Sequence, residues 1–301
     1  MYALVALPVA DLRREPTDVQ AMDGRDEGRL SQVLYNEVLL VADEQGEWLR
    51  VEAIEQPKFL GPAGWGGYPG WVRKKAVTVT EKPLGRNALI TRAHGAVVES
   101  PSLKAPLLFY LSFGTRLSTK GEAEGFLEIP LPHGKSGWVS KKDVTAAGRA
   151  DPAGQDVGRE LIRLARLFLG VPYLWGGRSM PPPTSTTMCG VDCSGFVNLV
   201  YRALGKDVPR DARDQWLASR PIGPDGLRQG DLIFLSRDEG LESIDHVMLS
   251  LGGEHFIEAP HTGEVVRMGS LSEKLGCSSG ALGRHDLTIE GKKLLFGRIE
   301  G

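Results

Sequence analysis

The first half of the chain alternates apolar and polar residues in short runs, which glycine and proline residues separate. Alternation with a period of two is typical of β-strands with one buried face, and 38 glycines and 19 prolines favour frequent turns. Two segments in this half, GYPGWVRKKAV at 67–77 and GKSGWVSKKDV at 134–144, share the pattern G-x-x-G-W-V-x-K-K-x-V. A repeat at this spacing indicates two copies of one small β-unit.

The two copies differ in length. The segment EWLRVE around Trp48 recurs as GFLEIP around Phe126, 78 residues later, whereas the shared tryptophan motif recurs after 67 residues. The first copy therefore carries about 11 extra residues (78 − 67), which fall near EQPKFLGPAGWG at 55–66. We expect them to form a longer connecting loop.

A small, polar segment at 146–158 separates the repeats from a second half with a different pattern. Apolar residues recur there at helical spacing, which predicts three helices, at 161–169, 193–204 and 211–219. Short apolar runs that predict strands follow at 231–236, 246–251, 255–259, 264–268 and 294–299. Helices followed by strands favour an α+β domain with an antiparallel sheet. The chain is predicted to have three domains, at 1–80, 81–147 and 148–301.

Composition narrows the classes of partner. The net charge is −2 and 25% of the residues are charged, so nothing favours a nucleic-acid partner. No apolar run approaches the roughly 18 residues of a membrane-spanning helix, so we expect no membrane partner. We also expect the protein to be a monomer. The N-terminal MYALVALPV lacks a basic residue before its apolar run and predicts a first strand, not a signal peptide. Two locations stay open: the cytoplasm, or the cell exterior after removal of an export signal.

Three cysteines, Cys189, Cys193 and Cys277, are too few and odd in number for a disulfide framework. Asp192 suits the N-cap of the helix that begins at Cys193, where free N–H groups and the helix dipole favour an anion. This position predicts a thiol pKa lowered from about 8.5 toward neutrality, and hence a nucleophilic thiolate. The alternatives are a Cys193 that only packs in the core, and a metal site with Cys189. Because C-x-x-x-C is not a usual zinc spacing, we expect no metal and no cofactor.

A cysteine nucleophile needs an imidazole within reach and a third group that orients the ring. His246 opens the run DHVMLSLGGEHFIEA, in which a Gly-Gly pair marks a hairpin. A three-residue loop at 251–253 puts His246 opposite Glu258, whereas a two-residue Gly-Gly loop puts Ala259 there. The longer loop predicts a Cys-His-carboxylate constellation.

Four ordered motifs resemble the NlpC-type cell-wall cysteine peptidases, which have a papain-like α+β fold. The motifs are VPYLWGG at 171–177, DCSGFVNLVYRALG at 192–205, LRQGDLIFL at 227–235 and DHVMLSLGGEHFIEA at 245–259. The two repeats resemble bacterial SH3-like modules, which are small all-β barrels. SQVLYNE at 31–37 resembles the entry motif of the first module in one branch, the γ-D-glutamyl-L-diamino acid endopeptidases. The resemblance implies a papain-like cysteine peptidase domain preceded by two SH3-like barrels.

The resemblance also implies a role for each residue that matches a family motif. Cys193 matches the nucleophile, His246 the general base, and Tyr173 the tyrosine beside the oxyanion and the substrate backbone. Asp192 and Ser194 flank the nucleophile and are expected to contact the substrate.

Arg210 and Asp211 match an Arg-Asp pair in the substrate pocket of this branch, where the aspartate holds the free N-terminal amine of the substrate. Several of these residues have structural alternatives. Asp192 and Asp211 also suit helix N-caps, Tyr173 a packing residue and Arg210 a solvated surface charge.

Glu258 departs from the family, in which the third catalytic residue is usually histidine. A carboxylate pairs with an imidazolium more strongly than a neutral ring does and raises the histidine pKa, so we expect activity to be retained. His261, three residues later, is an alternative polar partner.

The implied function is hydrolysis of the bond between γ-D-Glu and the diamino acid (diaminopimelate or lysine) of murein peptides with a free N-terminal L-Ala. The extra segment 55–66 and the Pro-rich segment 179–190 are expected to wall the cleft, which favours short free peptides and cell-wall recycling. Two alternatives stay open: a murein hydrolase of wall remodelling, and a catalytically inactive protein that binds wall peptides.

Overall fold

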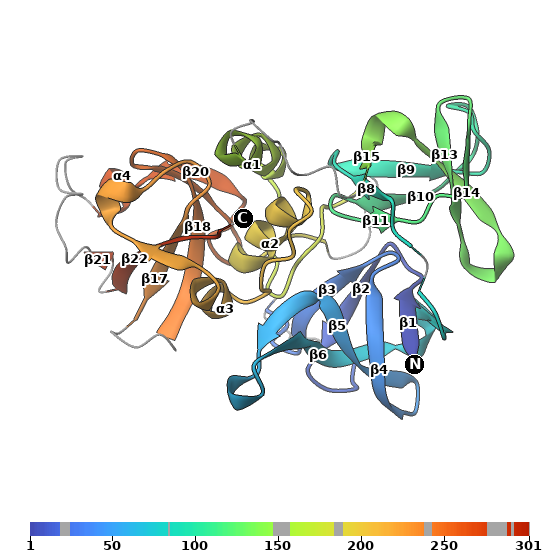
Figure 1. The fold of residues 1–301 in the computed structure, drawn as a ribbon, viewed down its shortest axis with the longest axis horizontal. Helices are drawn as coiled ribbons and strands as arrows, with labels where there is room; N and C mark the ends of the chain where they lie inside the picture. Colours follow the sequence, from blue (N-terminus) through green and yellow to red (C-terminus); the bar gives the residue numbers. More distant parts are fainter. Residues whose placement is uncertain are drawn as a thin grey trace.

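Figure 1 shows the fold in a computed structural model, which describes residues 1–18, 25–83, 85–146, 157–183, 189–237, 243–275, 288–289 and 292–300. Two β-rich units formed by the first half of the chain lie on one side of helix α2 (Cys193–Arg202), and the sheet of the C-terminal part lies on the other. Within the described ranges, no helix is long and apolar enough to cross a membrane. Cys277 lies outside the described residues.

The first β-unit is one antiparallel sheet. Its strands are β1 (Tyr2–Val5), β2 (Val9–Arg13), β3 (Arg29–Leu34), β4 (Val38–Gln45), β5 (Trp48–Phe59), β6 (Trp65–Arg73) and β7 (Val77–Thr80). They pair in the order β3-β2-β6-β5-β4-β1-β7, and the short 3-10 helix η1 (Gly61–Ala63) joins β5 to β6. Leu12, Val51 and Val72 are fully buried in one apolar cluster, as the alternating sequence pattern predicts.

The second β-unit has a core of its own, in which Ile90, Leu111 and Val139 are fully buried. Its strands are β8 (Ala88–Ile90), β9 (His94–Val98), β10 (Leu107–Ser112), β11 (Arg116–Leu117), β12 (Gly121–Ala123), β13 (Phe126–Pro130), β14 (Ser136–Ser140) and β15 (Val144–Ala146). They pair in the orders β10-β9-β14-β13-β12 and β11-β8-β15, and η3 (Pro132–Gly134) joins β13 to β14.

The repeat in the sequence is also a repeat in the structure. The shared motif forms a strand, a 3-10 helix and a second strand: β6, η2 (Lys74–Ala76) and β7 in the first unit, and β14, η4 (Lys141–Asp143) and β15 in the second. A Cβ atom at Gly70 would lie 2.6 Å from Leu12 Cγ, and one at the equivalent Gly137 would lie 2.6 Å from Val97 Cγ1. Close packing therefore requires this glycine in both copies. The SH3-like assignment and the three domain boundaries stay predictions.

The C-terminal part places helices first and an antiparallel sheet afterwards, as predicted. Its helices are α1 (Val157–Ala165), η5 (Arg166–Phe168), α2, α3 (Ala212–Leu217), η6 (Pro224–Gly226) and α4 (Leu271–Leu275). Its strands are β16 (Arg220–Ile222), β17 (Leu232–Ser236), β18 (Ile244–Gly252), β19 (His255–Glu258), β20 (Arg267–Ser270), β21 (Thr288–Ile289) and β22 (Lys292–Arg298). The sheet order is β16-β22-β17-β18-β19-β20, and β21 pairs with β22. Helix α2 packs on this sheet, because Phe196 and Val200 share a buried cluster with Val247 and Leu249 of β18.

One predicted strand differs from the structure. The sequence predicts a strand at 264–268, but β20 begins only at Arg267. The preceding residues pair instead with the chain that leads to α2: Tyr173 N donates to Glu264 O and Val266 N donates to Val171 O, each at 2.8 Å. This pairing buries Val266 and holds the segment around Tyr173 beside the sheet.

Candidate active site

Cys193 is the first residue of α2, and Asp192 is the N-cap of that helix, as predicted. Asp192 Oδ1 accepts a hydrogen bond from Gly195 N at 2.7 Å, which satisfies one free N–H group of the first turn. A Cβ atom at Gly195 would lie 2.2 Å from Gly177 O, so the helix start packs tightly on the preceding loop. Cys193 is therefore fixed in place and is only 8% exposed.

Strand β18 brings His246 to the cysteine. The backbone of Val247, the next residue, hydrogen-bonds to the Cys193 sulfur. His246 Nε2 lies 2.8 Å from Glu258 Oε2, so the predicted contact between histidine and carboxylate is present. Because the carboxylate accepts, Nε2 carries the proton and Nδ1 is left to act as a base. The catalytic roles of the three residues stay predictions.

The contact between His246 and Glu258 arises from a hairpin that differs from the predicted one. The loop between β18 and β19 is Gly253–Glu254 and follows a bulge, so it is neither the three-residue loop at 251–253 nor the two-residue Gly-Gly loop considered from the sequence. The observed register, continued by one pair, places Met248 and not His246 opposite Glu258. His246 is two residues from Met248 on the same face, and such diagonal neighbours are within reach of long side chains.

Glu258 is a buried anion with several cationic neighbours. It is 1% exposed, and Lys274 Nζ of α4 lies 2.5 Å from its Oε2 while Arg267 Nε lies 3.4 Å from its Oε1. Burial by itself raises the pKa of this carboxyl, but the hydrogen bonds and charges of His246 and Lys274 lower it to about 2. Glu258 is thus ionised at neutral pH and stabilises a positive charge on the His246 ring.

The predicted low pKa of the thiol is wrong for this structure. Burial raises the pKa of Cys193 to about 12, and the adjacent Asp192 carboxylate acts in the same direction. Arg210 and the backbone groups of Val247 and Ser194 favour the thiolate but do not offset burial. The resting group is therefore a neutral thiol, and its proton must pass to a base when the sulfur attacks.

A cavity of about 720 Å³ opens beside the histidine. His246 and Glu258 line it, together with Tyr173 from the segment before α2. The pKa of Tyr173 is raised first by burial and then by its electrostatic interactions with Cys193 and Asp192, which places the half-buried phenol near the cysteine. Tyr173 is therefore partly packed and also lines the cavity beside His246.

Arg210 is buried and is not the solvated charge of the alternative interpretation. Its NH1 and NH2 donate to the two Asp192 oxygens at 2.9 and 2.7 Å, and NH1 also donates to Ser194 Oγ at 3.0 Å. Its Nε donates to Ser31 Oγ of the first β-unit at 2.7 Å. At 1% exposure, Arg210 positions the residues that flank Cys193.

Asp211 occupies the N-cap position of α3, but its carboxylate makes no capping hydrogen bond, so the alternative capping role is wrong. Instead, Tyr68 OH donates to Asp211 Oδ1 at 3.0 Å, and Lys58 Nζ lies 2.5 Å from Oδ2. Both partners belong to the first β-unit. The carboxylate therefore faces the contact between that unit and the C-terminal part.

The extra residues of the first repeat lengthen β5 and β6, and these long strand ends dock on the start of α3. Arg210 N donates to Pro57 O at 3.1 Å, and Phe59 N donates to Asp214 Oδ2 at 3.0 Å. Segment 55–66 thus lies against Asp211, whereas the matching part of the second unit has no such extension. Of the second predicted wall, 179–190, residues 184–188 lie outside the described residues.

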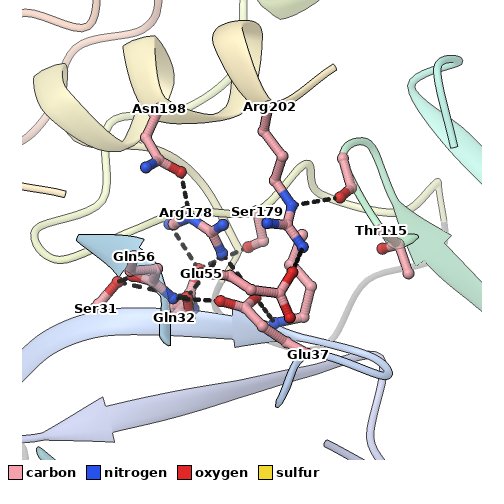
Figure 2. Close-up of polar contacts among 12 residues, drawn as sticks. Ser31, Gln32, Glu37, Glu55, Gln56, Thr115, Arg178, Ser179, Asn198 and Arg202 are labelled. Atoms are coloured by element: carbon pink, nitrogen blue, oxygen red, sulfur yellow. Dashed lines mark hydrogen bonds and ion pairs between the residues drawn. The ribbon is translucent and has the colours of Figure 1, made fainter. Parts of the chain in front are cut away.

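Figure 2 shows a buried polar network that joins the first β-unit to the segment before α2. Glu37 Oε2 accepts from Arg178 NH1 at 2.9 Å, and both side chains are fully buried. Glu37 Oε1 accepts from Gln56 Nε2 at 2.8 Å, and Gln56 Oε1 accepts from Ser31 Oγ at 2.6 Å. Since Ser31 also accepts from Arg210, hydrogen bonds link Glu37 to the residues beside Cys193.

Sequence reasoning missed the supporting residues of the site. The SQVLYNE match contains Ser31 and Glu37, and that motif was the signal that could have identified them. Lys274, which holds Glu258, gave no signal, because it is one lysine in a short helix. Lys58 lies in the extra segment 55–66, whose position against α3 depends on tertiary packing.

Three other candidate groups contribute less. Cys189 is a half-buried thiol and forms no disulfide with Cys193. Among the residues that the structure describes, no three His, Cys, Asp or Glu side chains are grouped to hold a metal ion. His261 is exposed, and its Nδ1 contacts Thr262 O at 3.0 Å, so Glu258 and not His261 is the polar partner of His246.

Comparison with known proteins identifies the family. A model of the NlpC/P60 family matches residues 170–277. The chain is 33% identical to a γ-D-glutamyl-L-lysine dipeptidyl-peptidase of Bacillus subtilis, over 81% of this chain and 77% of the relative. It is 30% identical to a protein of the same name from Bacillus cereus, over 76% of this chain and 67% of the relative. The crystal structure of an NlpC/P60 family protein from Bacillus cereus is similar to this structure, with a TM-score of 0.76 and 26% sequence identity. The match covers 90% of this chain and 94% of that one, and it confirms the predicted papain-like fold. The chain belongs to the NlpC/P60 family and is a cysteine peptidase.

Proposed function

We propose that the protein hydrolyses the bond between γ-D-Glu and the diamino acid of murein peptides, and that it acts on short peptides with a free N-terminal L-Ala. The observation that carries the proposal is the cysteine at a helix start beside the buried His246–Glu258 pair. The substrate class is supported by the two Bacillus relatives, whose names specify a γ-D-glutamyl-L-lysine bond. Removal of short wall peptides in this way suits cell-wall recycling.

In the proposed mechanism, the Cys193 thiol attacks the γ-carbonyl carbon of D-Glu and gives its proton to His246 Nδ1. The imidazolium is stabilised by Glu258, which accepts a hydrogen bond from Nε2. Because the pKa of Glu258 is about 2, this carboxylate is ionised at neutral pH. The imidazolium then protonates the leaving amine of the diamino acid, and the neutral ring activates water for deacylation. The products are L-Ala-γ-D-Glu and the diamino acid or its peptide.

The negative charge that develops on the carbonyl oxygen needs donors. Backbone N–H groups at the start of α2 are suited to this role, together with the hydroxyl of Tyr173. Because the pKa of Tyr173 is raised by burial and by nearby negative charge, the phenol keeps its proton and can donate. Asp192 and Ser194 are proposed to contact the substrate, and Arg210 to hold both in position.

The other end of the substrate is proposed to meet Asp211, whose carboxylate would pair with the N-terminal ammonium of L-Ala. Segment 55–66 of the first β-unit docks beside this residue. We propose that this segment walls off the end of the site and excludes the glycan that extends from the L-Ala of intact murein. This arrangement supports a free muropeptide as the substrate.

The test is to incubate the protein with L-Ala-γ-D-Glu-diaminopimelate, with its N-acetylated form and with insoluble murein, and to identify products by mass spectrometry. The proposal predicts release of L-Ala-γ-D-Glu from the free tripeptide, and loss of this release in Cys193→Ala. Cys189→Ala is the matched control and is expected to retain activity.

The substrates that are cleaved distinguish the proposed function from its alternatives. Cleavage of murein at a rate comparable with that of the free tripeptide would favour a hydrolase of wall remodelling. Failure of the wild type to cleave any γ-D-glutamyl bond would overturn the proposed function.

A further inference from the structure

The contact between Lys58 and Asp211 has a consequence for substrate selection. In the proposed function, Asp211 receives the ammonium group of the substrate, yet Lys58 of β5 already presents an ammonium group to it, with Nζ 2.5 Å from Oδ2. We infer that Lys58 occupies the ammonium position of Asp211 in the free enzyme and is a specificity-determining residue that competes with the N-terminus of the substrate. This inference rests on the proposed function of Asp211.

The pair is built into the fold and is not a chance surface contact. Tyr68 contacts both members of the pair. Its hydroxyl donates to Asp211 Oδ1 at 3.0 Å, and Lys58 Nζ lies 4.7 Å from the centre of the Tyr68 ring. Tyr68 is 6% exposed, and burial followed by the charge of Asp211 raises its pKa well above the usual range, so it stays a donor. The side chains of Lys58 and Asp211 are 28% and 33% exposed, which leaves the pair open to solvent and ligand.

A second carboxylate gives Lys58 a place to move. Asp214 Oδ2 lies 3.9 Å from Lys58 Nζ and already accepts from Phe59 N. A lysine ammonium sits on a flexible stem with several rotatable bonds, so it can exchange partners without movement of the backbone. When an incoming ammonium group binds Asp211, repulsion between like charges drives Lys58 toward Asp214.

This competition sets how strongly the enzyme distinguishes free from acylated peptides. In the wild type, part of the attraction between Asp211 and a free N-terminus is lost in displacing Lys58. Removal of the lysine charge leaves Asp211 with the Tyr68 hydrogen bond but without a cationic partner, so a free ammonium binds more tightly. A neutral N-acetyl group gains nothing from this carboxylate.

The experiment measures binding of L-Ala-γ-D-Glu and of its N-acetyl form by isothermal titration calorimetry, with wild type, Lys58→Met and Asp211→Asn. We expect Lys58→Met to bind the free dipeptide about 1.5- to 5-fold more tightly, the range of one partly exposed ion pair, and not to bind the acetylated one more tightly. Lys74→Met is the matched control, because Lys74 also pairs with a carboxylate, Glu44, within the same β-unit. It is expected to change neither affinity.

The outcomes separate this inference from the proposed function. If Asp211→Asn loses the preference for the free dipeptide while Lys58→Met leaves it unchanged, the inference about Lys58 is wrong and the role of Asp211 stands. Equal loss of affinity for both dipeptides in Lys58→Met would assign the lysine a purely structural role. If neither dipeptide binds any of the proteins, the inference fails, and hydrolysis of the tripeptide by the wild type then decides the proposed function separately.

Discussion

The two β-units share a motif and a local fold, yet they meet the C-terminal peptidase part in different ways. The first unit contributes two buried carboxylates: Glu37 pairs with Arg178 at 2.9 Å, and Glu55 pairs with Arg202 of α2 at 2.7 Å. Figure 2 shows both carboxylates beside their arginines. The first unit also holds Arg210, whose Nε donates to Ser31 Oγ at 2.7 Å.

The second unit meets the same part through a different set of contacts. Ser112 Oγ accepts from Met180 N at 2.8 Å, and Gly114 O accepts from Arg202 Nε at 2.7 Å. Its ion pair between Arg116 and Asp207 is partly exposed, at 14% and 28%. The repeated motif therefore determines the local fold, whereas the segments outside it determine what each unit does for the active site.

The largest expected effect comes from the buried pair of the first unit. Arg178→Met leaves the fully buried Glu37 without its cation, and loss of one partner of a buried ion pair costs about 3–5 kcal/mol of stability. Ser112→Ala is the matched change in the second unit and should cost only about 1–2 kcal/mol, the penalty of one neutral hydrogen bond. Urea unfolding of both variants checks the difference. Equal losses of stability in the two variants would show that the two β-units do not differ in this way.

Acid is expected to act on the first contact and on the catalytic pair together. Burial raises the pKa of Glu37, but Arg178 and Arg202 lower it to about 2, and Glu258 also has a pKa of about 2, against an ordinary 4.5. Since both folded-state values are depressed, the stabilisation is complete above pH 4.5 and is lost as the pH falls toward 2. The loss is on the order of 3 kcal/mol for each carboxylate.

The second unit should respond differently to acid. Burial raises the pKa of Asp143, so protonation of this residue favours the folded state.

The free energy of unfolding, measured between pH 6 and pH 3, should fall less steeply in Glu258→Gln than in the wild type. An unchanged slope would show that Glu258 is not held as an anion.

A moderate effect on turnover is expected from Ser31→Ala. The substitution removes the acceptor of Arg210 Nε and loosens the support of Asp192 and Ser194, so kcat/KM for the free tripeptide should fall about 10-fold. Ser136→Ala removes a hydroxyl that bonds Glu128 within the second unit, and should leave kcat/KM unchanged. A loss of stability without a loss of turnover in Ser31→Ala would deny it a positioning role.

The smallest effect is expected in the repeated motif of the second unit. Lys142 is exposed in η4. Its side chain forms no hydrogen bond or ion pair with the described residues of the peptidase part. Lys142→Ala should change stability by less than about 0.5 kcal/mol and turnover of the tripeptide by less than about 2-fold. A large loss of turnover would show that the second unit also takes part in small-peptide cleavage.

Local patterns were sufficient to predict the repeat, the main helices and the N-cap of α2. The contact between His246 and Glu258 was also predicted, but for the wrong register, because a bulge of one residue is not encoded in the alternation of the strand. The thiol pKa was predicted in the wrong direction, since the helix start was visible in the sequence and the burial of Cys193 was not.

Long-range contacts explain what the sequence did not predict. Arg210 is bonded to Ser31, 179 residues away, and Lys58 to Asp211, 153 residues away. No periodicity or capping pattern links positions so distant in the chain, so Arg210 and Asp211 could only be matched to a family motif, and their partners in the first unit stayed hidden.

The central claim is that the first β-unit, and not the second, completes the substrate site of the peptidase. Hydrogen–deuterium exchange of Cys193→Ala, with and without the free tripeptide, tests it most directly. We expect slower exchange in residues 57–68 and 210–214 on binding, and no change in 88–146. Protection confined to the peptidase part, or equal protection of both β-units, would contradict it.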